Sequence, residues 1–160
     1  VDRFIFGFEE SYGYLTGGYV RDKDAVAASM LIAEMAAYNM RNGTTLYQRL
    51  QELYQKYGYC KEAIINRVIG GIVPMDTMKE KMASLRACPP ASFGGSKVTE
   101  ATDYLCDGTG LPKANMLSYL LENGTTVLIR PSGTEPKIKV YILTRGESQE
   151  VCDQFQSQLP

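Results

Sequence analysis

The first third of the chain passes from an apolar, strand-like run to two segments with helical periodicity. Residues 1–8 are mostly aromatic or β-branched, which predicts a short buried strand that feeds a glycine-rich loop at residues 9–20. Apolar side chains then recur every three or four positions through residues 26–42, which predicts a mostly buried helix that ends near Gly43. A second helix follows at residues 46–57. Strand, loop and two helices together indicate an α/β arrangement.

The rest of the chain has a different hydrophobic pattern, because short runs of alternating apolar and polar residues replace the long helical periodicity. Asn123-Gly124 stands between two apolar runs, which is a strong signal for a β-hairpin with adjacent antiparallel strands. Isoleucine and valine alternate with lysine and tyrosine after Pro136, as in a strand with one buried face. The expected elements, in order, are strands 63–69 and 72–73, a helix 76–86, a strand 96–102, strands 116–121 and 125–130, a strand 136–144 and a final helix from Glu147.

This succession predicts two domains of different architecture. The first is α/β, and the second is α+β with an antiparallel sheet that helices cover on one face. We place the boundary close to Tyr57, which gives domains at residues 1–57 and 58–160. Residues 87–113 are rich in proline and glycine and indicate little beyond loop and one strand. Because the chain starts at Val1, inside an apolar run, we expect it to be a fragment of a longer protein.

Charge and composition exclude several classes of protein. Seventeen Lys and Arg residues against eighteen Asp and Glu residues give a net charge of -1, so we expect no nucleic-acid partner and no membrane partner. No apolar run approaches the roughly 20 residues that span a bilayer, and the start lacks the zones of a secretory signal, so we expect a cytoplasmic protein. The four cysteines are far apart and there is no histidine, which argues against a zinc site. Any anion binding must therefore be local.

The segment Arg130-Pro131-Ser132-Gly133-Thr134-Glu135-Pro136-Lys137 offers such a local anion site between two expected strands. It combines a forked guanidinium, two hydroxyls and backbone N–H groups around its glycine, where the chain can approach a ligand closely. The two prolines stiffen the loop and reduce the entropy that binding costs. The same residues also suit an ordinary solvated turn, so their chemistry leaves both interpretations open.

This segment resembles, without a gap, the C-terminal phosphate-binding signature of the α-D-phosphohexomutase family, which includes phosphoglucomutases and phosphomannomutases. The resemblance continues into the Ile-Lys-Val-Tyr strand that follows. In that family the loop grips the phosphate already present on the substrate. The resemblance therefore implies phosphate binding by Arg130, Ser132, Gly133 and Thr134, and secondarily by Lys137.

A second segment, Gly7-Phe8-Glu9-Glu10-Ser11-Tyr12-Gly13, resembles the sugar-recognition loop in the third domain of the same family. The resemblance implies that Glu9 and Ser11 contact the sugar, since a carboxylate and a hydroxyl can fix hydroxyl groups that both donate and accept. Without the resemblance, paired glutamates in a loop are commonly just solvated. Phe8, where many relatives carry glycine, resembles the branch with phosphopentose-active mutases and leaves the identity of the sugar open.

The segment Arg21-Asp22-Lys23-Asp24 resembles the family's Arg-Glu-Lys-Asp segment, whose lysine faces the active site. The resemblance makes Lys23 an assisting catalytic residue that stabilises phosphoryl oxygens or helps a proton move. A charge cluster at a helix start is also commonly an exposed cap, and that alternative stands beside it. Together the resemblances imply that residues 1–57 are the C-terminal part of the sugar-binding third domain and that residues 58–160 are the phosphate-binding fourth domain.

The resemblance also defines what the chain lacks. Family members carry a phosphorylated serine in a Ser-His-Asn-Pro context and a metal loop of alternating aspartates, and neither is present here. The implied parent is an isomerase that interconverts sugar 1-phosphates and 6-phosphates through a bisphosphate, with Mg²⁺ bound outside this fragment and neither metal nor cofactor on this chain. Its partners would be the phosphosugar and the missing N-terminal domains, and the fragment alone would be inactive. A phosphopentomutase-like parent and a non-catalytic sugar-phosphate-binding module are the alternatives.

Overall fold

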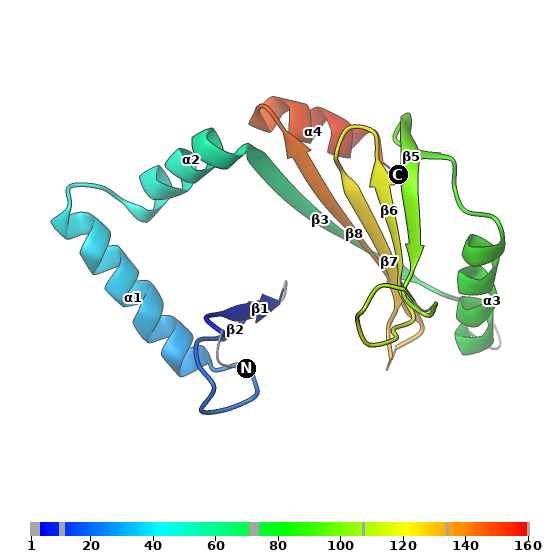
Figure 1. Cartoon of the computed structure of the whole chain (residues 1–160), viewed down its shortest axis with the longest axis horizontal. Helices are drawn as coiled ribbons and strands as arrows, with labels where there is room; N and C mark the ends of the chain where they lie inside the picture. The colour runs from blue at the N-terminus through cyan, green and yellow to red at the C-terminus, as the bar shows by residue number, and fades with distance from the viewer. Residues whose placement is uncertain (1–3, 10–11, 71–73, 107, 134, 160) are drawn as a thin grey trace. The chain divides into compact units, whose positions relative to one another are not determined.

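The structure is a computed structural model that describes residues 4–9, 12–70, 74–106, 108–133 and 135–159. The chain separates into two compact units, Val1–Lys56 and Tyr57–Pro160, and each has its own sheet (Figure 1). The strand expected at 72–73 lies outside the described residues.

The first unit begins with a two-stranded antiparallel sheet, β1 (Gly7–Glu9) and β2 (Gly13–Leu15). Tyr12, directly before β2, has a φ of 61°, in the left-handed region that non-glycine residues seldom adopt. The sequence predicts a strand at residues 1–8; within the described residues β1 begins only at Gly7, and residues 1–3 lie outside them. The strand β2 lies in the expected loop. The glycines weaken the strand signal, because glycine is depleted in strands.

Two helices follow, α1 (Ala25–Arg41) and α2 (Leu46–Tyr57). Asp24 caps α1, since its side chain accepts a hydrogen bond from the N–H of Val26 and another from the next residue. Both helices lie where they were predicted, but the expected burial of α1 is wrong: Val26 is 81% exposed and Met30 is 69% exposed. The periodicity correctly finds an apolar face, but it cannot indicate what covers that face.

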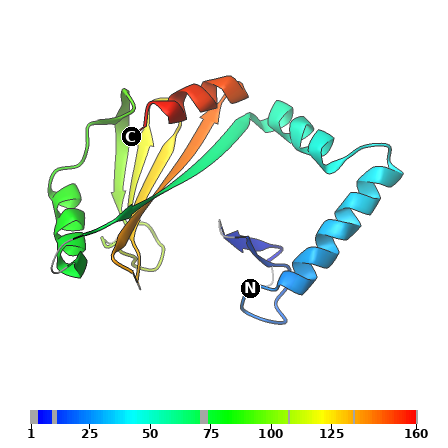
Figure 2. The ribbon, with the colours of Figure 1, turned by 180° about the vertical axis from the view of Figure 1, so that it is seen from behind.

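The second unit is built on a six-stranded antiparallel sheet with the order β3-β8-β7-β6-β5-β4 (Figure 2). Its longest pair joins β3 to β8, from Tyr59 opposite Gly146 to Val68 opposite Lys137. The predicted hairpin is confirmed, because β6 and β7 pair on either side of Gly124. The strands are β3 (Tyr59–Val68), β4 (Ser92–Phe93), β5 (Ser96–Asp103), β6 (Leu117–Leu121), β7 (Thr126–Pro131) and β8 (Lys137–Gly146).

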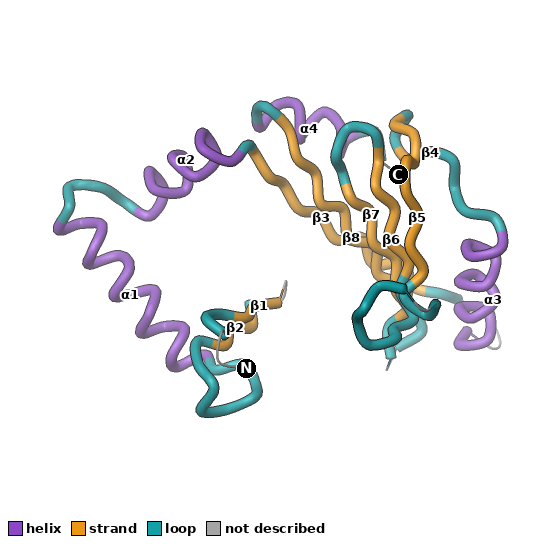
Figure 3. The backbone as a smooth tube through the Cα atoms, viewed as in Figure 1, coloured by secondary structure: helices purple, strands orange, loops and turns teal. Residues whose placement is uncertain are grey.

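Helices α3 (Pro74–Ala87) and α4 (Gln149–Ser157) cover one face of this sheet, as the sequence predicts (Figure 3). Met78 and Met82 of α3 join Tyr119 and Ile129 of the sheet in one buried apolar cluster. Met82 and Tyr119 are each 1% exposed, so this layer is closely packed. The cluster packs against β7 and β8, the two strands that the loop at residues 130–137 connects.

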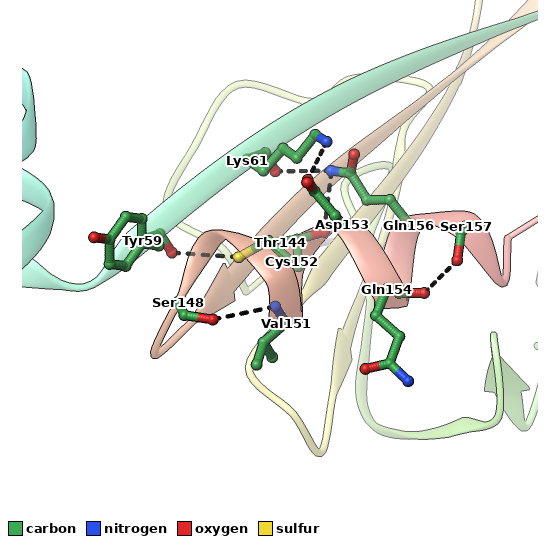
Figure 4. Close-up of polar contacts among 10 residues, drawn as sticks. All are labelled: Tyr59, Lys61, Thr144, Ser148, Val151, Cys152, Asp153, Gln154, Gln156 and Ser157. Carbon is green, nitrogen blue, oxygen red and sulfur yellow. Dashed lines mark hydrogen bonds and ion pairs between the residues drawn. The ribbon is translucent and has the colours of Figure 1, made fainter. Parts of the chain in front are cut away.

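Polar contacts fasten α4 to the edge of the sheet (Figure 4). Cys152 is fully buried and its thiol lies 3.7 Å from the carbonyl oxygen of Tyr59. Burial raises the pKa of this thiol. The Gln156 side chain donates to the carbonyl oxygen of Lys61 over 3.1 Å, and Lys61 forms an ion pair with Asp153. These contacts bind β3 to the last helix of the chain.

Arg86, near the end of α3, connects the helix to β5. Its Nε donates to Asp103 Oδ2 over 3.0 Å, and both side chains are less than a quarter exposed. Its Nη2 donates to the amide oxygen of Asn115. Burial opposes ionisation of Asp103, but the hydrogen bonds from the Leu105 N–H and from Arg86 outweigh it and lower the pKa of Asp103. The cluster therefore holds the segment that follows β5 against α3.

Candidate functional site

The first candidate site is a hollow beside the short hairpin of the first unit. It has a volume of about 280 Å³ and is lined by Gly7, Phe8, Glu9, Gly13, Leu15 and residues 21–23. We call it the hairpin pocket. Glu9 and Lys23, both expected as site residues, line it together, whereas Ser11 lies outside the described residues.

Lys23 is placed against the carboxylate of Glu9. Its Nζ lies 3.5 Å from Glu9 Oε1 and 3.8 Å from Asp22 Oδ1. The Lys23 side chain is 54% exposed and that of Glu9 is 41% exposed, so both can still reach a ligand. A carboxylate and an ammonium side by side supply an acceptor and donors to one hydroxyl-bearing molecule.

Gly13 makes this arrangement possible. It stands opposite Glu9 in the hairpin, and the stem of Lys23 lies directly over it. A Cβ at this position would be 2.2 Å from Lys23 Cδ and 2.7 Å from Glu9 Oε1, so both charged side chains would have to move to make room for it. The glycine-rich composition of the segment therefore has a specific cause at Gly13, which is the space that the two charged side chains occupy.

The start of α1 fixes the backbone of Lys23. The Asp24 N–H donates to the carbonyl oxygen of Tyr14 over 2.8 Å, which attaches the helix start to β2. The Tyr19 hydroxyl donates to Asp24 Oδ2 over 2.6 Å and, together with the cap hydrogen bonds, lowers the pKa of Asp24. Asp24 is thus occupied as a helix cap, while Lys23 points to the hairpin pocket.

Two further residues, to which the sequence analysis assigned no ligand contact, line the hairpin pocket. Arg21 is exposed and lies on the same short segment as Lys23. Phe8 is 74% exposed and stacks on Phe6, with ring centroids 5.9 Å apart. The sequence signal for Arg21 was present in the Arg-Asp-Lys-Asp segment, but only its lysine was assigned a role there.

The second candidate site is the loop between β7 and β8, at residues 130–137. Arg130 is exposed near the end of β7 and pairs across the strands with Lys139. Its guanidinium carbon lies 5.8 Å from the centre of the Tyr141 ring, and Lys139 Nζ lies 6.0 Å from the same point. Within the part of the chain that the structure describes, Arg130 makes no ion pair. Two cations thus flank one aromatic ring on this face of the sheet.

Backbone hydrogen bonds close the loop at its base. The Ser132 N–H donates to the carbonyl oxygen of Lys137 over 2.8 Å, and the Pro136 carbonyl oxygen accepts from the Ile69 N–H over 2.7 Å. The Ser132 N–H is therefore already used, which leaves its hydroxyl as the donor it can offer to a ligand. Gly133 is exposed with open space around it. Thr134 lies outside the described residues.

Lys137 is engaged within the loop itself. Its Nζ lies 2.6 Å from Glu135 Oε2, and the Lys137 side chain is only 23% exposed. The hydrogen bond from Lys137, followed by its charge, lowers the pKa of Glu135. A phosphate that used Lys137 must therefore displace this carboxylate, a competition that the sequence did not reveal.

The described residues were also compared with what a metal site and a membrane-spanning helix require. In residues 4–9, 12–70, 74–106, 108–133 and 135–159, no group of three or more Cys, Asp or Glu side chains is arranged to hold a metal ion. Asp22 and Asp24, which stand on either side of Lys23 in the sequence, lie respectively beside the Lys23 ammonium and in the helix cap. No helix in the described part of the chain is long and apolar enough to cross a bilayer.

These features define a class of protein: an α/β unit with a carboxylate and an ammonium beside a hairpin, followed by an α+β unit with a basic loop between two strands. The chain belongs to the phosphoglucomutase/phosphomannomutase family. Residues 2–57 match the family model "alpha/beta/alpha domain III", and residues 78–158 match that of the C-terminal domain.

Comparison with individual proteins agrees with this membership. The chain is 37% identical over 149 residues to a phosphoglucomutase of Staphylococcus aureus strain MSSA476 and 36% identical to that of strain N315. The match covers 86% of this chain but only 27% of either relative. Among solved structures, the open form of the phosphoglucomutase pp63/parafusin from Paramecium matches 93% of this chain and 29% of its own, with a TM-score of 0.59 and 15% identity. This last likeness concerns the fold alone.

Proposed function

We propose that this chain is the substrate-recognition portion of a phosphosugar mutase. In this proposal, residues 1–57 are the C-terminal part of the sugar-binding domain and residues 58–160 are the phosphate-binding domain. The family membership and the match of residues 2–57 and 78–158 to two consecutive family domains support the division. The parent would be an isomerase of carbohydrate metabolism, as the names of the Staphylococcus aureus relatives suggest.

The observation that carries the proposal is the contact of Lys23 with Glu9 across Gly13. Glu9 would accept hydrogen bonds from sugar hydroxyls, and Ser11 would add a second contact. Lys23 would assist by holding Glu9 in place and by donating to a hydroxyl or a phosphoryl oxygen. The Cβ clash at Gly13 supports a functional rather than a capping role for Lys23, because a solvated cap needs no glycine beneath it.

The loop between β7 and β8 would hold the phosphate that is not being transferred. Arg130 supplies a forked pair of donors, and Ser132, Gly133 and Thr134 supply a hydroxyl and backbone groups around it. Lys137 would join after exchanging Glu135 for the phosphate, which suits a secondary contact. Because these donors read a phosphate and not the carbon that bears it, one loop serves a 1-phosphate and a 6-phosphate alike.

The chemistry of transfer would belong to the rest of the parent. A phosphoserine donor and bound Mg²⁺, which neutralises charge during phosphoryl transfer, are placed outside this chain in the proposal. The chain alone would be inactive and would work with the N-terminal domains of the same protein. Cytoplasmic location and the absence of nucleic-acid and membrane partners stay predictions from the sequence.

Amide NMR on the 160-residue chain tests the two recognition sites separately. Glucose 1-phosphate should shift the amide signals of both Gly13 and Gly133. Glucose should shift that of Gly13 alone, and inorganic phosphate that of Gly133 alone. If millimolar glucose 1-phosphate shifts the amide signal of neither Gly13 nor Gly133, the proposal is wrong.

Two alternative functions are distinguished from this proposal by further tests. Phe8, which lines the hairpin pocket, favours a phosphopentose substrate, and a stronger response to ribose 1-phosphate than to glucose 1-phosphate would support it. A non-catalytic sugar-phosphate-binding module remains the other. An upstream coding region with a Ser-His-Asn-Pro segment favours the mutase, and translation that starts at the Val1 codon favours the binding module.

A further inference from the structure

A second hollow lies in the second unit, on the face of the sheet that α3 covers. It has a volume of about 570 Å³ and lies between residues 67–70, α3 and a sheet floor of Ile129, Ile138 and Val140. We call it the α3 groove. Because neighbouring residues of a strand point to opposite faces, Ile129 lies on the helix-covered face and Arg130 on the other. The α3 groove and the Arg130 side chain thus lie on opposite faces of the sheet.

The interior of the α3 groove is mostly apolar. Leu85 of α3 faces the three aliphatic floor residues. A smaller hollow of about 150 Å³ shares Arg67, Ile129 and Val140 with it and reaches Phe93 and Leu159. The apolar surface thus continues along the face between the two helices. A ligand with an elongated hydrocarbon body can bury its length there.

The charged residues that line the α3 groove are both basic. They are Arg67, at the end of β3, and Lys81, on α3. Neither forms an ion pair with any residue that the structure describes. Two other cations of α3 do form ion pairs: Lys79 pairs with Asp76, and Arg86 pairs with Asp103. The described charged lining of the groove is therefore positive, which favours an anionic ligand.

We propose that the α3 groove binds an amphipathic carboxylate, an aliphatic chain whose head is held by Arg67 and Lys81. The fork of Arg67 suits the two carboxylate oxygens, and Lys81 contributes a point charge from α3. The hydroxyl of Ser84, on the exposed side of the groove, adds a polar rim. The chain of the ligand then lies on Ile129, Ile138 and Val140. This ligand is distinct from the sugar phosphate proposed above.

Decanoate is the probe for this site. Titration into the 160-residue chain, followed by amide and methyl NMR, should give saturable shifts at Ile129, Val140 and Lys81 below the micelle-forming concentration. Decyltrimethylammonium, which has the same chain and the opposite charge, should bind at least tenfold more weakly. Equal affinity for the two ions, or no saturation by decanoate, would overturn the proposal.

Substitutions locate the binding. Arg67→Met and Lys81→Met keep the aliphatic stems and should each weaken decanoate about tenfold, since each removes one charged hydrogen-bond donor. Lys79→Met on the same helix should leave the affinity unchanged. Ser84→Trp fills the groove from an exposed position and should abolish saturable shifts while the thermal midpoint stays within a few degrees. An unchanged affinity for decanoate in the Arg67, Lys81 and Ser84 variants would refute the site. If the amide signal of Gly133 still responds to inorganic phosphate in all of these variants, the two sites are separate.

Discussion

The ammonium of Lys23 lies 3.5 Å from the carboxylate of Glu9 and reaches it across the Cα of Gly13. The two charges come from different elements, since Glu9 ends β1 and Lys23 precedes α1. The contact therefore forms only when β1 and the start of α1 are folded against each other. It also explains why a residue without a side chain stands between them.

Gly13→Ala should weaken sugar-phosphate binding more than it weakens folding. The new Cβ would displace the Lys23 stem and the Glu9 carboxylate, which are flexible side chains that can move at little cost in stability. We expect about a tenfold loss of affinity for glucose 1-phosphate, as for a lost hydrogen bond to a charged group, with little change in thermal midpoint. Gly18→Ala is the matched control, because a Cβ there meets nothing within 4 Å. Equal affinities of the two variants would contradict the assigned role of Lys23.

Arg130→Met should reduce the affinity for inorganic phosphate by about ten- to a hundredfold, the range expected for a lost hydrogen bond between charged groups. Arg130→Lys should recover part of the loss, since it restores the charge but not the fork. Arg49→Met, which breaks an exposed ion pair with Glu52 in α2, should leave phosphate binding unchanged. Isothermal titration measures all three. A full rescue by lysine would mean that charge alone is read at this position.

Asp103→Asn should lower stability near neutral pH and change its dependence on acid. The pKa of Asp103 is lower in the folded chain than its usual value, so its contribution is present above about pH 4 and is lost as the pH falls through the folded value. We expect the variant to be about 1 kcal/mol less stable at pH 7, and the difference to be smaller at pH 3 than at pH 7. Urea denaturation at both pH values measures this. Asp76→Asn, which removes an exposed ion pair with Lys79, should cost about 0.5 kcal/mol or less at either pH.

Two methionine substitutions compare the apolar surfaces of α3 and α1. Met82→Ala should destabilise the second unit by about 2–5 kcal/mol, because it leaves a cavity in the buried cluster. Met30→Ala should change stability by about 0.5 kcal/mol or less, because Met30 is 69% exposed in α1. Denaturant titration of the 160-residue chain gives both values. A large effect at Met30 would mean that the face of α1 is covered in solution.

Hydrophobic pattern and turn chemistry predicted most elements of the fold. The helices α1 and α2 and the hairpin at Gly124 follow from periods and turn residues that lie close together in sequence. The burial of α1 and the presence of β2 did not follow. Burial depends on which other segments cover a face, and a strand of three residues that starts with glycine carries almost no pattern.

The candidate sites were predictable only as sets of residues. The family resemblance brought Glu9 and Lys23 forward as separate candidates, and the folded hairpin brings them together in one pocket. The sequence could not indicate that Glu135 forms an ion pair with Lys137, or that the Ser132 N–H donates to the Lys137 carbonyl oxygen. Both contacts depend on the path of the backbone between β7 and β8. Arg130 beside the Tyr141 ring likewise required the register of the two strands.

The pairing of β3 with β8 sets an order of assembly for the second unit. β3 lies at the sheet edge, so its neighbour is the last strand of the chain, whereas β6 and β7 are joined by a tight turn. Closing the large intervening loop costs entropy before any of its contacts form, so the local hairpin forms first and β3 docks late. During synthesis on the ribosome, β3 must wait with its apolar side chains uncovered until β8 has emerged, which makes this strand the segment most exposed to premature association.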